Sequence, residues 1–135
     1  MVPQAPFMEH PTGQFADAVA AMTDAVARLR ALPIWDRWIT FTAQGVGHRP
    51  DSFRCAEIQL FGSTLAIDAS PLDLPLILKV ARVNSTALVT HGAQYSVAHA
   101  SPEQAARILD AIFRHHLGIR PFPDEGDDYA VGAEW

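Results

Sequence analysis

The fold of this chain is decided by one stretch of its 135 residues, Ala56-Glu-Ile-Gln-Leu-Phe-Gly-Ser-Thr-Leu-Ala-Ile-Asp-Ala69. Within it, Gly62-Ser63 has the form of a two-residue hairpin turn, with glycine first as a type II′ turn requires. One face of the hairpin then carries three apolar pairs, Leu60 with Leu65, Ile58 with Ile67, and Ala56 with Ala69. The other face holds Phe61, Thr64, Gln59, Ala66, Glu57 and Asp68. A slip of one residue would mix these sets, so the pattern predicts both the hairpin and its register.

Two further segments have the composition of strands. Residues 35–43 are rich in aromatic and β-branched residues, and Ile39 and Phe41 alternate with Trp38, Thr40 and Thr42. Residues 86–99 are expected to form a second hairpin that turns at Gly92-Ala93. Its inner face pairs Leu88 with Val97 and Thr90 with Tyr95, and its outer face pairs Val89 with Ser96 and His91 with Gln94.

The first helix is expected over residues 14–32, where apolar residues recur at helical spacing. They form one stripe of five side chains, Phe15, Val19, Met22, Val26 and Leu29. Asp24 and Arg28 lie off this stripe as a favourable i,i+4 pair. Pro33 ends the helix, because the residue before a proline is pushed out of the helical region.

A second long helix is expected to begin after Ser101, which supplies an N-cap. Pro102 occupies the first helical position, Gln104 completes a capping box, and the helix runs to Leu117 and ends at Gly118. The predicted buried stripe is Ala105, Ile108, Leu109, Ile112 and Phe113, and the predicted wet face is Arg107, Asp110 and Arg114.

Residues 71–83 fit two structures. Asp73 suits the cap of a short helix with Pro75 in its first turn, whereas Leu74, Leu76 and their neighbours also alternate as in a strand. We favour the helix.

The order of elements predicts the fold class. Hairpins rather than crossovers join the strands, so we expect an α+β fold with a mainly antiparallel sheet, packed by an N-terminal and a C-terminal helix. Residues 1–13 contain three prolines and are expected to be a loose arm, residues 14–120 a single α+β domain, and residues 121–135 an acidic tail.

The composition of the chain excludes several classes of protein. No apolar run approaches the roughly 18 residues needed to span a bilayer, and residues 1–15 lack the basic and apolar regions of a signal peptide. The single cysteine, Cys55, excludes an intramolecular disulfide and a thiolate zinc site. We therefore expect a cytoplasmic protein without a membrane partner.

The net charge of −5 belongs to the tail, because the acids and bases of residues 1–120 balance. A neutral body with an acidic end disfavours nucleic acid as a partner and suits a basic protein. The tail also carries aromatic residues that favour burial, so we expect it to pack on the body or on a partner. The tail residues predicted to bind the partner are Asp124, Glu125, Asp127, Asp128, Tyr129 and Trp135.

Glu57 and Asp68 lie directly opposite each other in the predicted hairpin, where like charges are unfavourable unless something offsets them. They are predicted to receive an arginine or lysine of a partner. Two other interpretations are an acid/base couple and an exposed strand end, where solvent screens both charges or Arg54 pairs with Glu57.

Other candidate sites are weaker. Cys55 beside Arg54 is a candidate nucleophile, but a cysteine nucleophile needs a histidine within reach, and a small structural residue fits its position better. The loop with Gly45 and Gly47 lacks the third glycine and the helix of a nucleotide-binding fingerprint. The six histidines lack metal-binding spacing, and the tail lacks a calcium-loop pattern. We expect no cofactor and no metal.

These observations predict a non-catalytic protein-binding module. Within that class we favour a bacterial immunity-type protein that neutralises a cognate basic toxin domain. The first alternative is a small acidic secretion chaperone, which would dimerise through an apolar helix face. The second is a small hydrolase or isomerase that uses Glu57 and Asp68, or Cys55 with a histidine.

Overall fold

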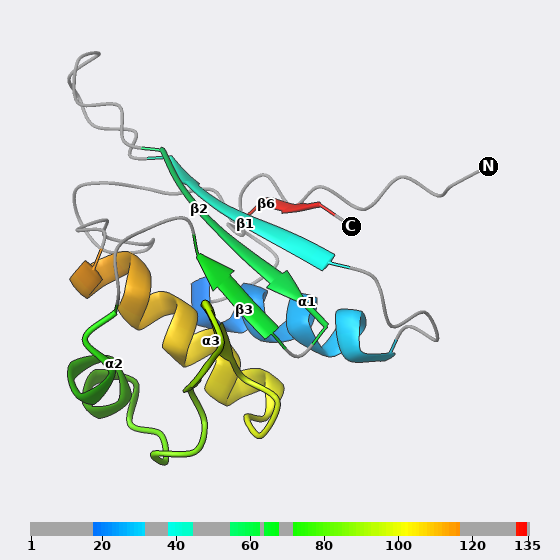
Figure 1. Cartoon of the computed structure of the whole chain (residues 1–135). Coiled ribbons are helices and arrows are strands. Elements are labelled where there is room, and N and C mark those ends of the chain that lie inside the picture. Colours follow the sequence, from blue (N-terminus) through cyan, green and yellow to red (C-terminus); the bar gives the residue numbers. More distant parts are fainter. Residues whose placement is uncertain are drawn as a thin grey trace, which may run out of the picture.

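The structure, a computed structural model, describes residues 18–31, 38–44, 55–62, 64–67, 72–116 and 132–134 (Figure 1). In chain order the elements are α1 (Ala18–Ala31), β1 (Trp38–Gln44), β2 (Cys55–Phe61), β3 (Thr64–Ile67), α2 (Leu74–Ala81), β4 (Val89–His91), β5 (Gln94–Ser96), α3 (Pro102–Ala111), the π-helical turn η2 (Ile112–His116) and β6 (Gly132–Glu134). The predicted arm at 1–13, Asp68, residues 117–131 and Trp135 lie outside the described residues.

The strands form one six-stranded sheet in the order β4-β5-β3-β2-β1-β6, and each neighbouring pair is antiparallel. The helices α1, α2 and α3 lie on one side of this sheet, and α1 packs against α3 (Figure 1). This arrangement confirms the predicted α+β class, with an antiparallel sheet packed by an N-terminal and a C-terminal helix. The core lies between the sheet and the helices.

The hairpin of β2 and β3 has the predicted register. Ile58 pairs with Ile67 and Leu60 with Leu65, and Gly62 has the positive φ of 56° that the turn requires. Ile58, Leu60 and Leu65 are fully buried, and Ile67 packs against the same core. The further pairs that involve Asp68 and Ala69 lie outside the described residues and stay predictions.

The second hairpin also has the predicted register. Its predicted faces are confirmed at Leu88, Val97 and Tyr95, which lie in or against the core, and at His91 and Gln94, which are exposed, but they were wrong at two positions. Thr90 was placed on the inner face and is exposed, whereas Ser96 was placed on the outer face and is buried. The strands are three residues long, and β4 forms one edge of the sheet, where Thr90 meets solvent. The chain turns back after Ser96, whose hydroxyl accepts a hydrogen bond from the backbone N–H of Ala98.

The predicted stripe of α1 is confirmed where the structure describes it. Met22, Val26 and Leu29 are buried and Val19 is partly buried, while Phe15 lies outside the described residues. The helix also buries three alanines, whose small side chains let α1 and α3 approach closely. These are Ala18, Ala21 and Ala25.

Residues 74–81 form the helix α2, so the alternative strand was wrong. Asp73 is the N-cap, and its Oδ1 accepts a hydrogen bond from the N–H of Leu76 at 3.3 Å. Pro75 is tolerated because it lies in the first turn, where its missing N–H has no helical partner. The helix ends at Arg82, which adopts the left-handed conformation with φ 57°.

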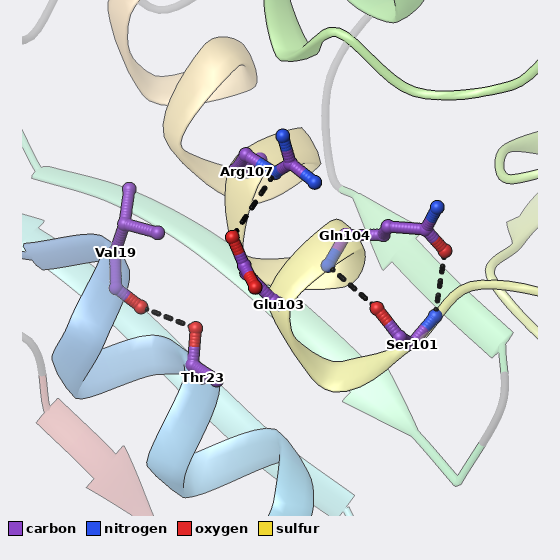
Figure 2. Close-up of polar contacts among 6 residues, drawn as sticks. All are labelled: Val19, Thr23, Ser101, Glu103, Gln104 and Arg107. Atoms are coloured by element: carbon purple, nitrogen blue, oxygen red, sulfur yellow. Dashed lines mark hydrogen bonds and ion pairs between the residues drawn. The ribbon is translucent and has the colours of Figure 1, made fainter.

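The capping box of α3 is confirmed (Figure 2). Ser101 Oγ accepts from the N–H of Gln104 at 3.2 Å, and Gln104 Oε1 accepts from the N–H of Ser101 at 2.9 Å. All five residues of the predicted stripe are buried. The predicted α-helix nevertheless ends at Ala111, where the π-helical turn η2 begins; residues 117 and 118 lie outside the described residues.

The face of α3 that was predicted to be solvent-exposed is only partly exposed. The Asp110 side chain is 16% exposed, because Arg114 lies along the helix and its Nε donates to Asp110 Oδ2 at 3.0 Å. Arg107 is likewise half-buried, beside Glu103.

The Tyr95 hydroxyl joins the sheet to α2. It accepts a hydrogen bond from the N–H of Leu72 at 2.7 Å, just before Asp73 caps the helix. Because Leu72 is buried, Tyr95→Phe leaves this N–H without its acceptor and is expected to lower the free energy of unfolding by about 1–2 kcal/mol. Urea unfolding at equilibrium measures the change.

The matched control for Tyr95→Phe is Thr90→Val, at the exposed cross-strand partner of Tyr95. It is expected to change the free energy of unfolding by no more than about 0.5 kcal/mol. Equal stability of Tyr95→Phe and the unaltered protein would show that the hydroxyl contributes nothing.

Candidate functional site

The two sides of the fold differ in chemistry. On the helical side, acids and bases of α1 and α3 form ion pairs in which the base follows the acid by four residues. The pairs are Asp24–Arg28 at 2.9 Å, Glu103–Arg107 at 3.9 Å and Asp110–Arg114 at 3.0 Å; Figure 2 shows the second. Each of these pairs is neutral in itself, and α1 and α2 also carry the bases Arg30 and Lys79.

The opposite face of the sheet carries two exposed aromatic side chains. Trp38 and Phe61 pair across β1 and β2, with ring centroids 6.2 Å apart and ring planes tilted by 42°. Trp38 is 45% exposed and Phe61 39% exposed. Their neighbours Ile39 and Leu60 are fully buried under the helices, and alternation along each strand therefore turns both rings away from the core.

Three half-buried residues lie on the same face as the aromatic pair. Thr64 pairs with Phe61, and Gln59 pairs with Ala66, one row further along the hairpin. We call this surface the aromatic face; it consists of Trp38, Gln59, Phe61, Thr64 and Ala66. Exposed large apolar side chains gathered on one surface are typical of protein-binding sites.

Comparison of the chain with protein-family models, with curated proteins and with solved structures returned no match. The candidate site therefore rests on its own geometry.

The end of the acidic tail joins the sheet beside the aromatic face. In β6, Glu134 pairs with Thr40 and Gly132 with Thr42, so β6 lies along β1, the strand that carries Trp38 (Figure 1). Thr40 also pairs with Gln59. Glu134 thus occupies a row of the sheet that crosses the aromatic face.

Charge in this part of the sheet has one sign. The described ranges of β1, β2, β3 and β6 contain no lysine or arginine, and their charged residues are two acids, Glu57 and Glu134. Glu57 pairs with Thr42 of β1, two residues along β2 from Gln59.

The other sequence-predicted site residues are not brought together by the described part of the structure. Asp68, Tyr129 and Trp135 lie outside the described residues, as do the four acids Asp124, Glu125, Asp127 and Asp128. The pairing of Glu57 with Asp68 stays a prediction. Cys55 pairs with Gln44 at the far end of β2 from Phe61.

Sequence reasoning missed the aromatic pair as a site. The alternation patterns had set Trp38 and Phe61 apart from the apolar positions of their own strands. The missing information was the register between β1 and β2, which a long connecting segment separates in sequence. Two aromatic residues on the outer positions of predicted strands were the available signal.

The guanidinium of Arg30 has a structural role. Its Nη1 donates to the carbonyl of Ala100 and its Nη2 to the carbonyl of Val97 at 2.8 Å, which fastens α1 to the segment before α3. Burial lowers the pKa of Arg30 from its usual value, but an arginine stays charged in proteins. Its hydrogen bonds are therefore used within the fold rather than for a ligand.

Within the described ranges, no helix combines the length and apolar character needed to cross a bilayer. Histidine, cysteine, aspartate and glutamate side chains form no group of three suited to a metal ion among the same residues.

Proposed function

We propose that this chain is a protein-binding module of the immunity type, which occupies and neutralises a cognate basic toxin domain. The observation that carries the proposal is the exposed Trp38–Phe61 pair on the aromatic face. Tryptophan and other large aromatic residues often dominate the binding energy of protein interfaces. Both residues stand on hydrogen-bonded strands, so little ordering is needed when a partner covers them.

The charge of the chain supports a basic partner. The net charge of −5 derives from residues 121–135, and the end of that segment pairs with β1 as β6. Opposite charges on a partner would speed its approach and orient it toward this side of the sheet. The paired charges of the helical side offer no comparable attraction.

The acidic charge and the exposed aromatic pair suit the neutralisation of a toxin. A toxin that cuts nucleic acid needs a basic surface to hold its substrate. An acidic protein with an apolar anchor competes for that same surface, and its binding blocks the substrate. A nuclease domain is therefore the partner class that the charge and the aromatic face suit together.

Co-expression tests the proposed function. If a gene beside this one encodes a large secreted protein, its C-terminal domain is the candidate toxin, and that domain is expressed with and without this chain. We expect the toxin domain alone to stop growth, and the chain to restore growth and to bind the purified domain. Toxicity that persists beside abundant chain would contradict the proposal.

Neutralising the acidic tail is expected to slow association with the toxin domain. The substitutions are Asp124→Asn, Glu125→Ser, Asp127→Asn and Asp128→Ser. At low ionic strength we expect the association rate constant to fall about tenfold, with a smaller change in the dissociation rate constant, since steering by exposed charges acts on encounter. Stopped-flow measurements at several salt concentrations give both constants.

The control for the tail variant is Glu103→Gln, which removes an exposed acid of the helical side. It is expected to leave the association rate within about twofold, because this acid lies beside Arg107 on the other side of the molecule. An unchanged rate and salt dependence after neutralisation of the tail would remove the tail from the interface.

A second candidate function, the secretion chaperone, is favoured by one observation on α2. Leu76 is 41% exposed, and Ile77 and Ala81 are the buried residues of this apolar helix. A chaperone of this type would use such a helix face to form a dimer. Sedimentation equilibrium separates the candidates: a dimer that Leu76→Glu dissociates favours the chaperone, and a monomer favours the immunity-type protein.

A further inference from the structure

We propose that the outer edge of β1 is a strand-addition site, which β6 occupies in the free chain and an extended segment of the partner occupies in the complex. The inference rests on the proposed function and adds the way in which the partner reaches the aromatic face. It follows from three features of the sheet: the unequal cover of the two edges of β1, the composition of β6, and the position of Trp38 on β1.

The two edges of β1 are covered to different extents. On one edge, β2 pairs with all seven residues, from Trp38 to Gln44. On the other edge, β6 pairs with three of them, Thr40, Phe41 and Thr42 (Figure 1). Among the described residues, the remaining four positions of β1 have no strand beside them on this outer edge. The backbone N–H and C=O groups along a strand edge form a template for a further strand.

The strand β6 holds this edge weakly. Its residues are Gly132, Ala133 and Glu134, types that are depleted in strands, whereas β1 consists largely of aromatic and β-branched residues. A three-residue ladder at the edge of a sheet belongs to the parts of a fold that open most readily. The pairing of β1 with β2 is anchored by Phe41 and Ile58, which are cross-strand partners and fully buried. Replacement of β6 therefore breaks few contacts and leaves the rest of the sheet in place.

A longer strand on this edge would continue into the aromatic face. Residues that pair across neighbouring strands form rows, and the side chains of one row lie on the same side of the sheet. Trp38, Phe61 and Thr64 form one such row. The strand β6 pairs with Thr40, two residues from that row, whereas a strand paired with the whole of β1 places one of its side chains beside Trp38. Strand addition thus combines backbone hydrogen bonds along β1 with contact to the exposed indole.

The occupant that this edge suits is an extended segment of the toxin domain rather than a second copy of this chain. A second copy could donate its own β6, but exchange of β6 between copies forms the same three pairs and adds no cover beside Trp38. An extended segment of another protein can pair with the full length of β1. Its alternate side chains, those on the side of Trp38, would then supply specificity.

A peptide titration on the full chain tests the strand addition. The probe is a nine-residue peptide of alternating valine and threonine between terminal lysines. The matched control peptide has two neighbouring central amides N-methylated, which blocks hydrogen bonding at both of its edges and keeps every side chain. Binding is followed through backbone amides in two-dimensional NMR spectra. We expect the largest shifts in β1 and β6, and at least about tenfold tighter binding of the unmethylated peptide.

Two substitutions at one residue of β6 test whether this strand must leave. Gly132→Pro removes a backbone N–H and disfavours the strand, so it is expected to tighten peptide binding about three- to tenfold. Gly132→Thr raises the strand propensity and is expected to weaken binding about threefold. The control is Thr90→Pro in β4, at the opposite edge of the sheet, which is expected to leave the affinity within about twofold. Far-ultraviolet circular dichroism and thermal unfolding verify each fold.

The outcomes separate this inference from the proposed function. Equal binding of the two peptides, shifts that spare β1 and β6, or equal affinity of Gly132→Pro and Gly132→Thr would each overturn strand addition. A dimer that Gly132→Pro dissociates would also overturn it, in favour of exchange of β6 between copies. If Gly132→Pro and Gly132→Thr neutralise and bind the toxin domain equally well, the immunity-type function stands and the strand contact is wrong. The expected order of peptide affinities beside a toxin domain that stays active would reverse that conclusion.

Discussion

Truncation of Leu60 to alanine is expected to lower the free energy of unfolding by about 2–5 kcal/mol. Leu60 is fully buried and lies in the row Ile39–Leu60–Leu65, which continues through Tyr95 of β5 to Thr90 of β4. Its side chain belongs to the core between the sheet and the helices, and removal of its terminal carbons leaves a cavity that the sheet cannot easily close. Urea unfolding at equilibrium, followed by circular dichroism, measures the loss.

The matched control for Leu60→Ala is the next residue of the same strand. Phe61 has a larger side chain, but it is 39% exposed on the opposite face, so Phe61→Ala is expected to cost about 1 kcal/mol or less. Backbone position and β-propensity are nearly shared by the two sites, and burial is what differs. A larger loss at Phe61 than at Leu60 would overturn the assignment of faces in β2.

The parts of the fold that were predicted correctly depend on local signals. The register of β2 and β3 follows from one turn glycine and from alternation over six residues on each side. The start of α3 follows from Ser101, Pro102 and Gln104, and the start of α2 from Asp73. In each case the deciding interaction joins residues within a few positions of one another, so the sequence pattern and the structure report the same contact.

The parts that were missed depend on contacts distant in sequence. The strand β6 consists of Gly132, Ala133 and Glu134, which have low strand propensity, and it forms through pairing with β1, about ninety positions earlier. The burial of Ser96 depends on how the chain turns back after β5. Propensity and periodicity do not contain this information, because tertiary packing decides it.

For the candidate site, too, local features were predicted and contacts distant in sequence were missed. The sequence pattern directed attention to Glu57 and Asp68, because two acids opposite each other in a hairpin are unfavourable unless something offsets their charge. It could place Trp38 and Phe61 at outer positions of two separate strands but could not join them, since the β1–β2 register spans the segment 45–54. The acids of the tail were visible as a net charge, whereas the place of Glu134 in the sheet required the pairing of β6 with β1.

Removal of both rings is expected to have the largest effect on binding. The double variant Trp38→Ala, Phe61→Ala is expected to lower affinity for the toxin domain at least about thirtyfold, because aromatic anchors at the centre of an interface often contribute 2 kcal/mol or more each. Most of the loss should appear as faster dissociation, since the rings act by contact after encounter. Surface plasmon resonance at fixed ionic strength gives both rate constants.

The control for the double variant is Leu76→Ala, at the exposed apolar residue of α2. It removes apolar surface from a different part of the molecule and is expected to change the affinity less than about twofold. Because the rings act on dissociation and the tail acids on association, combining the two sets of substitutions should give nearly additive losses. A strong effect of Leu76→Ala beside an inert double variant would move the interface from the aromatic face to α2. An effect of the rings confined to association would contradict their role as anchors.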